Sequence, residues 1–214
     1  MKLTENQRKA VNVVDGNYLV HASQGSGKTS SFIARIATLI KNEGVHPTNI
    51  LGLTFTKEAA NNMRVRLRKT VGDLLSSQVY LSTFHSFAYK IMKQNYPEYN
   101  NVTIIEPWLA NQIANDIVKA KGGNNQDGHN LGINTGLFLD FVSYQKNHMV
   151  RYQDNILLDD NTSYVSHINR TTLQSAFDTY CKRMENAKKI SFDDMLLDFY
   201  SKLESDSNLL NSLR

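Results

Sequence analysis

Along the first 95 residues, short apolar runs alternate with segments in which apolar side chains recur every three or four positions. Such runs are typical of buried strands, and such spacing is typical of helices packed on one face. The chain holds three pairs of strand and helix in this order: 18–22 with 28–42, 50–54 with 57–71, and 79–83 with 84–94. Three strand-then-helix units predict a parallel sheet covered by helices, which is the α/β class.

A further helix is expected over about residues 4–14. Thr4 and Gln7 have the spacing of a capping box, in which each side chain bonds the backbone of the other residue. The apolar stripes of the later helices are expected to face the core: Phe32, Ile33, Ile36 and Ile40; Ala60, Met63 and Leu67; Phe84, Phe87, Ala88 and Ile91.

The pattern changes after Pro97, where helical spacing dominates. Helices are expected at 107–120, 137–146, 171–188 and from Ser191 onward, and the segment 121–136, rich in Gly and Asn, is expected to be a loop. The apolar positions of the first of these helices are Trp108, Ile113, Ile117 and Val118, and those of the last, which lie on one stripe, are Phe192, Met195, Leu196, Phe199 and Leu203. We predict a sheet domain over 1–95, a mostly helical insertion over 96–189, and a helix over 190–214 that returns to the sheet domain.

Between the first expected strand and helix lies a glycine loop, Ala22-Ser-Gln-Gly-Ser-Gly-Lys-Thr29. It fits the P-loop pattern [AG]-x4-G-K-[ST], and a strand before and a helix after are the required context. The glycines let the backbone N–H groups converge on phosphate oxygens, and the helix N-terminus adds its positive dipole end. The predicted phosphate-binding residues are Ala22, Ser23, Gln24, Gly25, Ser26, Gly27, Lys28 and Thr29. Lys28 would reach the β- and γ-phosphates, and the Thr29 hydroxyl would ligate Mg²⁺; a loop that matches by chance is the disfavoured alternative.

Composition and charge narrow the class of protein. With 41% hydrophobic and 21% charged residues, the 214-residue chain is an ordinary globular one. The single cysteine, Cys181, excludes an internal disulfide and a cysteine-based zinc cluster. No run of 18 apolar residues and no apolar leader segment is present, so we expect a cytoplasmic protein with no membrane partner. The net charge of +4 divides into +8 over residues 1–95 and −4 over the rest, which favours a basic binding face in the first half.

Four sequence blocks occur in a fixed order: LTENQRKAV, the glycine loop, TFTKEAANNMRVRL and STFHSFAYKIM. Together they resemble the opening motifs of the UvrD/Rep-type superfamily 1 DNA helicases, and FLDFVSYQKN and ISFDDMLLDFY are similar to the helical subdomain inserted in that family's first RecA-like domain. Residues 97–136 match poorly. The resemblance implies a P-loop NTPase fold, ATP and Mg²⁺ as cofactors, and ATP hydrolysis coupled to DNA unwinding.

The resemblance also implies roles for single residues of the nucleotide site. Gln7 matches a glutamine that binds the adenine edge, although it can equally serve the capping box with Thr4. Arg35 matches an arginine near the nucleotide, or it is a solvated helix residue. Ser30 stands where relatives often have arginine, so one positive contact to the nucleotide is absent. Lys28 and Thr29 are the expected catalytic residues of this segment.

On the DNA side, a basic helix follows an aromatic residue. Residues 57–70 carry five cations and one acid, and cations that track phosphates beside a ring that stacks on a base are what a single strand requires. The residues predicted to bind DNA are Phe55, Lys57, Arg64, Arg68, Thr83 and His85. Phe55 is alternatively a core residue, and His85 an exposed histidine without a ligand. The implied partners are single-stranded DNA, junctions of duplex and single strand, and a second RecA-like domain.

A P-loop ATPase also needs an acidic residue at a strand end to hold Mg²⁺ and a base to position water. Asp159 and Asp160 follow a short apolar run but are not favoured for this role, and Asp193 and Asp194 are expected to complement a helix dipole. We therefore expect the acidic motif in a later part of a longer protein. Two other functions remain open: a P-loop kinase for a nucleotide or small molecule, and a non-catalytic module that docks on a partner chain.

Overall fold

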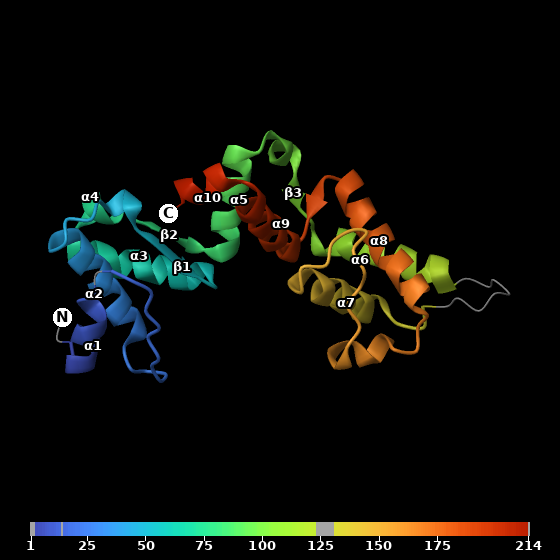
Figure 1. Ribbon diagram of the computed structural model, residues 1–214, viewed down its shortest axis with the longest axis horizontal. Coiled ribbons are helices and arrows are strands. Elements are labelled where there is room, and N and C mark those ends of the chain that lie inside the picture. The colour runs from blue at the N-terminus through green and yellow to red at the C-terminus, as the bar shows by residue number, and fades with distance from the viewer. Residues whose placement is uncertain (1–2, 14, 123–130, 214) are drawn as a thin grey trace. The chain divides into compact units, whose positions relative to one another are not determined.

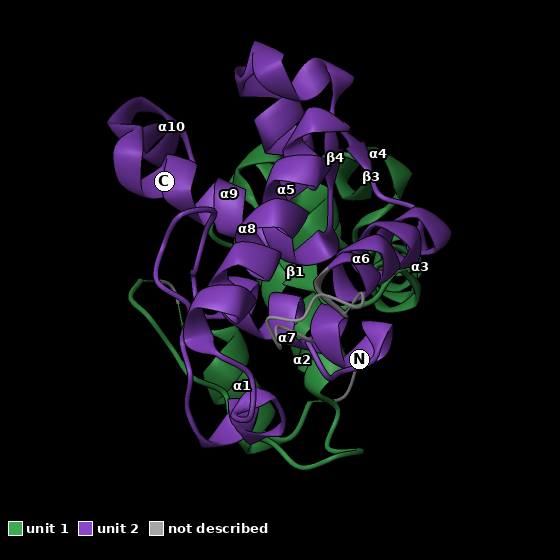
Figure 2. Ribbon diagram, turned by 90° about the vertical axis from the view of Figure 1, so that its right-hand side faces the viewer, with its two compact units in different colours: residues 1–87 green, residues 88–214 purple. Residues whose placement is uncertain are grey.

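The computed structural model describes residues 3–13, 15–122 and 131–213, and it groups the chain into two compact units, residues 1–87 and 88–214 (Figure 2). Both contain helices, and each contains one pair of parallel strands, so the chain is a mixed α/β protein (Figure 1). Among the described residues, no helix is long and apolar enough to cross a membrane.

The first unit follows the predicted order of elements closely. It contains α1 (Glu5–Val11), α2 (Lys28–Lys41), η1 (Pro47–Asn49), β1 (Leu51–Thr54), α3 (Lys57–Val71), α4 (Asp73–Ser76), β2 (Tyr80–Thr83) and the start of α5 (Phe84–Asn95). The capping box of Thr4 and Gln7 is present at the start of α1, and Thr56 caps α3 by accepting a hydrogen bond from the backbone N–H of Ala59 at 3.0 Å.

Strands β1 and β2 pair in parallel, with Leu51 opposite Tyr80 and Thr54 opposite Thr83. Helix α3 connects them and packs on both strands and on α2. Gly52 in β1 lets Leu81 of β2 and Phe32 of α2 lie close to the strand, because a Cβ atom there would lie 2.3 Å from Leu81 Cδ2 and 3.2 Å from Phe32 Cζ. The expected core residues Ile33, Ile36, Ala60, Leu67, Phe87 and Ala88 are buried.

The strand predicted at 18–22 does not form, and this prediction was wrong. These residues have no regular secondary structure, and Leu19 is 95% exposed. A strand needs a neighbouring strand to satisfy its backbone N–H and C=O groups, and among the described residues β1 pairs only with β2. Two of the three expected strands therefore share one parallel sheet.

Four aromatics at apolar helix positions lie at the surface: Phe32, Phe84, Trp108 and Phe192. Phe84 was expected in the core, and that prediction was wrong. Each of the four lies near the start of its helix. Trp108, for example, is 65% exposed, whereas Ile113 and Ile117 farther along the same helix are buried. Helical spacing identifies a face of a helix but not where along that face the packing ends.

The second unit is mostly helical, as predicted. Its elements are the rest of α5, η2 (Pro97–Asn101), β3 (Thr103–Ile104), α6 (Pro107–Gly122), α7 (Thr135–Asn147), η3 (Asp160–Val165), α8 (Arg170–Asn186), β4 (Lys189–Ile190), α9 (Phe192–Ser205) and α10 (Ser207–Ser212). Helices α6, α7 and α8 pack around Phe138, Phe141 and Phe177, and the rings of Phe141 and Phe177 meet edge to face at 6.4 Å. Of the loop expected at 121–136, residues 123–130 lie outside the described residues.

Helix α9 packs on α7 and β4 in this unit, and its buried residues are Met195 and Leu197. The expected division into 1–95, 96–189 and a returning helix over 190–214 stays a prediction. Asp159 and Asp160 do not end a strand, because Asp159 caps η3 through the backbone N–H of Asn161.

A buried ion pair joins α7 to α9. The Lys146 side chain is only 3% exposed, and its Nζ lies 2.7 and 2.8 Å from the two carboxylate oxygens of Asp194. Asp194 also closes a capping box with Ser191 at the start of α9. One carboxylate thus begins a helix and neutralises a buried cation on another.

The first prediction concerns the core of the first unit. Leu67 is fully buried in α3, whereas Val65 on the same helix is 53% exposed. Leu67→Ala should lower the free energy of unfolding by about 2–5 kcal/mol, because a cavity remains where the side chain packed. Val65→Ala should change it by less than about 0.5 kcal/mol. Urea unfolding followed by circular dichroism measures both, and equal effects would contradict the burial assigned to Leu67.

The second prediction concerns the buried ion pair. Asp194→Asn leaves the Lys146 ammonium buried without a counter-charge, so it should destabilise the protein by about 3–5 kcal/mol. The surface pair of Arg183 and Asp116, at 3.8 Å, is the matched control in the same unit. Asp116→Asn should cost no more than about 1 kcal/mol. Thermal unfolding of both variants tests the difference, and a mild effect of Asp194→Asn would show that water reaches the pair.

Candidate nucleotide-binding site

The glycine loop ends where α2 begins, and two backbone torsions shape that junction. Gly27 is the N-cap residue of α2 with φ +87°, and Gly25 has φ +79°. Both angles lie in the left-handed region that side chains other than glycine rarely adopt. Around Gly25 no atom lies within 4 Å of the place a Cβ would take, so the backbone there is open to a close approach.

The side chain of Lys28 lies against this loop. Its Nζ donates hydrogen bonds to the carbonyl oxygens of Ala22 and Ser23, both at 2.8 Å. The Ser26 hydroxyl donates to the same Ser23 carbonyl at 2.6 Å. No side chain caps the start of α2, so the N–H groups of its first turn remain for a ligand of the loop.

Gln7 connects α1 to the loop. Its Oε1 accepts the backbone N–H of Thr4 at 2.9 Å, and its Nε2 donates to the carbonyl of Ser26 at 2.9 Å. The same Nε2 lies 2.7 Å from the position of a Cβ on Gly27. The capping role of Gln7 is therefore confirmed, and its contact with the loop was not predicted. The adenine role stays a prediction.

A cavity of about 320 Å³ lies beside the loop and brings several predicted residues together. Lys28, Thr29 and Arg35 of α2 line it with Ala10 of α1 and Leu53 of β1. The Arg35 Nη1 donates to the carbonyl of Val11 at 3.0 Å, so this side chain also ties α2 to the end of α1. No Asp or Glu is among the described residues that line the cavity.

These groups fit a nucleoside triphosphate with Mg²⁺. The Lys28 ammonium and the N–H groups of α2 are phosphate donors, and the Thr29 hydroxyl is an oxygen ligand of the kind that Mg²⁺ takes. The described residues hold no group of three or more His, Cys, Asp or Glu side chains able to bind a metal ion alone. The donor set therefore fits a magnesium ion that arrives with phosphate oxygens.

The candidate DNA residues lie at the ends of β1 and β2. Phe55 follows β1 and is 85% exposed, so the alternative that it belongs to the core is wrong. Its ring contacts that of Phe84, with centroids 5.6 Å apart and planes tilted by 55°. Lys57 begins α3 beside this pair and is also exposed.

The two predicted arginines of α3 contact the protein itself. Arg64 donates to the carbonyl of Leu81 in β2 and to Asn61 Oδ1, and Arg68 forms a two-fold contact with the carboxylate of Asp73. The hydrogen bonds from Arg68 hold the pKa of Asp73 below its usual range. Sequence reasoning missed Asp73, although Gly72 signalled the turn that brings it back to the helix.

Thr83 and His85 lie at the junction of β2 and α5. Thr83 is buried, and its Oγ1 accepts the backbone N–H of Ser86 at 3.1 Å and bonds the Ser86 hydroxyl at 2.8 Å. Thr83 thus acts as a helix cap, a role that the sequence did not reveal. His85 is half-buried in the first turn of α5. The DNA roles of both residues stay predictions.

Comparison with known proteins gives a family. A family model described as the UvrD/REP helicase N-terminal domain matches residues 3–214. The ATP-dependent DNA helicase PcrA of Staphylococcus aureus (strain Mu50 / ATCC 700699) is 29% identical over 194 residues, which are 89% of this chain and 25% of that protein. PcrA of Leuconostoc citreum is 28% identical over 202 residues, with 91% of this chain and 25% of that protein covered. The chain spans about a quarter of the length of these relatives. The family suggested by the ordered motifs is confirmed, and the chain belongs to the UvrD/REP helicase N-terminal domains.

Proposed function

We propose that this chain is the ATP-binding part of an ATP-dependent DNA helicase or translocase that engages single-stranded DNA. The observation that carries the proposal is the glycine loop, in which Lys28 and the N-terminus of α2 face a cavity also lined by Thr29 and Arg35. The relatives are named as ATP-dependent DNA helicases. The proposed fold of the first unit is the P-loop, RecA-like one, within a cytoplasmic protein.

The proposed nucleotide site stabilises the phosphates by placing positive charge beside them. Lys28 and the helix N-terminus offset the negative charge of the phosphates, and Thr29 supplies a hydroxyl to Mg²⁺, which neutralises phosphate charge when bound. Gln7 holds the loop through Ser26. Its proposed second role, binding the adenine edge, rests on the resemblance to the family. Arg35 supplies a further cation at the cavity.

Turnover needs groups that this cavity does not contain. Hydrolysis requires a carboxylate for the metal and a base for water, and no acidic residue is among the described residues lining the cavity. We propose that both come from a later part of the protein, together with a second RecA-like domain. ATP-driven closure of two such domains would then move single-stranded DNA and open junctions with duplex.

The DNA surface proposed for this chain is the Phe55–Phe84 ring pair with Lys57. An exposed ring offers a stacking face to any base, and a nearby ammonium pairs with the backbone phosphate. Arg64 and Arg68 extend the positive potential along α3 while they hold Leu81 and Asp73. Thr83 and His85 lie at the adjoining end of β2.

The third prediction concerns nucleotide binding. Lys28→Ala should abolish binding of Mg-ATP to the 214-residue chain, because the cation at the loop is lost. Lys182→Ala removes an exposed lysine of α8 and should leave binding unchanged. Equilibrium dialysis with labelled ATP measures both. Wild-type turnover should be negligible, since none of the described residues that line the cavity carries a carboxylate. Strong DNA-stimulated ATP hydrolysis by this chain would refute that part of the proposal.

The fourth prediction concerns single-stranded DNA. Phe55→Ala should weaken binding to oligothymidylate by about 1–3 kcal/mol and leave the salt dependence unchanged, because stacking releases no counterions. Lys57→Ala should make the slope of log K against log salt shallower by about 0.7, the value for one phosphate contact. Fluorescence anisotropy at several salt concentrations measures both effects.

The matched control for this pair of variants is Lys182→Ala. Because Phe55 is exposed, its removal should leave the melting temperature unchanged, so weaker binding reports a lost contact with DNA. Arg64→Ala is a poor test, since this side chain holds the backbone of β2. Equal salt slopes in Lys57→Ala and the wild type would mean that Lys57 is only a solvated residue.

A further inference from the structure

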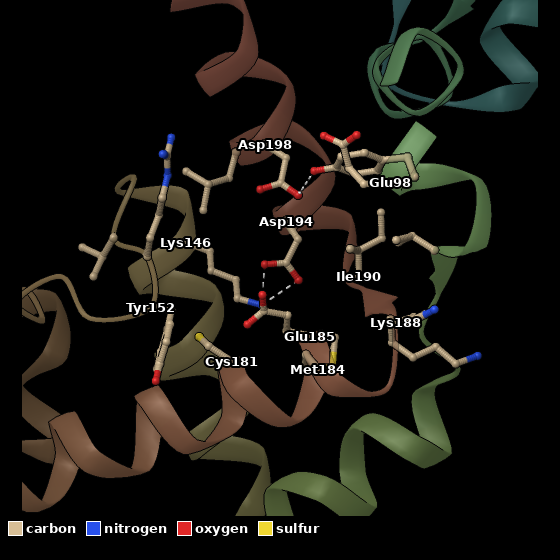
Figure 3. Close-up of a pocket in the computed structure, with 16 residues that line it drawn as sticks. Glu98, Lys146, Tyr152, Cys181, Met184, Glu185, Lys188, Ile190, Asp194 and Asp198 are labelled. Atoms are coloured by element: carbon tan, nitrogen blue, oxygen red, sulfur yellow. Dashed lines mark hydrogen bonds and ion pairs between the residues drawn. The ribbon is translucent and has the colours of Figure 1, made fainter. Parts of the chain in front are cut away.

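The second unit contains a cavity of about 570 Å³ that lies outside the nucleotide and DNA residues discussed above (Figure 3). Its walls come from η2, the end of α7 with the segment that follows, α8, β4 and α9. This volume lies in the range of sites for small molecules. Its apolar lining residues are Val102, Val150, Met184, Ile190 and Leu197.

The cation inside the cavity is already satisfied. Lys146 Nζ binds both carboxylate oxygens of Asp194, at 2.7 and 2.8 Å, and its side chain is almost fully buried (Figure 3). It also lies 5.4 Å from the centroid of the Tyr180 ring. An anionic ligand would have to compete with Asp194 for this ammonium group.

The carboxylate of Asp198 is less well satisfied. One of its oxygens accepts a hydrogen bond of 2.6 Å from the Tyr99 hydroxyl, and the other has no hydrogen bond to the described residues. Burial raises the pKa of Asp198, which indicates poor solvation of its charged form. Burial and the neighbouring Asp198 also raise the pKa of Tyr99, so this hydroxyl stays protonated and remains a donor. The charge that lacks a close counter-ion inside the cavity is therefore negative.

The other cations that line the cavity, Arg151, Lys188 and Lys189, form no ion pair with Asp198 in the described part of the chain, and Lys188 is exposed to solvent and lies away from Asp198 (Figure 3). Arg151 is exposed, and its side chain makes no hydrogen bond to Asp198 in the described part of the chain. Lys189 pairs with Glu106 at 3.1 Å. Arg151 and Lys146 therefore act on Asp198 only through their longer-range charge.

The backbone around the cavity is strained at three places. Met149, Gln153 and Lys188 have φ values of +64°, +71° and +52°. The first two flank the wall segment 150–152, and the third lines the cavity. Left-handed torsions in residues other than glycine persist where surrounding contacts enforce them, and they concentrate at ligand sites. Here the Gln153 N–H bonds Asp178 Oδ1 at 3.0 Å, which holds the segment in place.

We propose that this cavity binds a small aliphatic cation, with an ammonium or guanidinium head on Asp198 and its carbon chain along Val150, Met184 and Leu197. Tyr152 lines the same cavity, and an aromatic ring there favours a ligand that carries a positive charge. The site does not depend on the nucleotide site, and its ligand is a free metabolite of this chemistry.

Agmatine, which carries both kinds of head, is the probe for an NMR titration of the ¹⁵N-labelled 214-residue chain. Saturable shifts are expected at the amides of Val150 and Leu197. Asp198→Asn should weaken binding by about tenfold or more, because the counter-charge is lost. Asp140→Asn, at an exposed carboxylate of α7 outside the cavity lining, is the matched control and should bind agmatine as the wild type does.

Three further arms make the result decisive. Tyr152→Ala, at a part-exposed side chain, should weaken binding several-fold even where Asp198→Asn fails to fold. Pentanoate, an anion of similar length, should not bind. Capped arginine distinguishes the source of the cation: weaker binding than agmatine supports a free metabolite, and tighter binding overturns it in favour of a protein side chain. Absence of agmatine binding, or equal binding by both cavity variants and the wild type, overturns the proposal.

Discussion

The left-handed backbone at Gly27 is the constraint on which the proposed nucleotide site depends. It turns the chain from the loop into α2, and the Lys28 side chain lies back against the loop, where its Nζ bonds the carbonyls of Ala22 and Ser23. The Gln7 amide occupies the space that a side chain on residue 27 would need, and it bonds the carbonyl of Ser26. Because Gln7 also completes the cap of α1, one backbone torsion and one side chain join α1, the loop and α2. A side chain at residue 27 would strain this backbone torsion, and it would also displace the Gln7 amide from the Ser26 carbonyl.

The cationic side chains of α3 have two roles, a positive surface and contacts within the fold, and the amino-acid composition does not distinguish them. The excess of cations on this helix gives a positive surface, yet Arg64 and Arg68 are held by Leu81 and Asp73. Such contacts orient α3 on β2 and on the turn that follows α3, while the positive charge of the two arginines remains at the surface. Exposed pairs of this kind stabilise a fold only weakly, so their place in the structure matters more than their energy. Phe55 is different, since its exposed ring contacts little of the protein besides Phe84.

In the second unit, two carboxylates that line one cavity differ in how far their negative charge is compensated. Asp194 neutralises Lys146 and accepts hydrogen bonds from Ser191, so its charge is compensated within the fold. Asp198, one helical turn farther along α9, accepts one hydrogen bond from the described residues, donated by the Tyr99 hydroxyl. Compensated buried charges maintain structure, whereas an incompletely compensated one favours a partner of opposite charge. The two residues illustrate how position along one helix separates a structural carboxylate from a binding one.

The sequence alone determined what depends on neighbours within a few residues. The capping box of Thr4 with Gln7 and the spacing of apolar positions in α2 and α3 predicted helices that the structure contains, and the glycine loop indicated a phosphate site. Tertiary structure decided whatever needs a distant partner. The run at 18–22 has the composition of a strand, but no described strand pairs with it. The ion pair of Lys146 with Asp194 joins residues 48 positions apart, and no local sequence pattern predicts it. Local propensity acts within a turn of helix, whereas strand pairing and buried charge need partners that only the folded chain brings together.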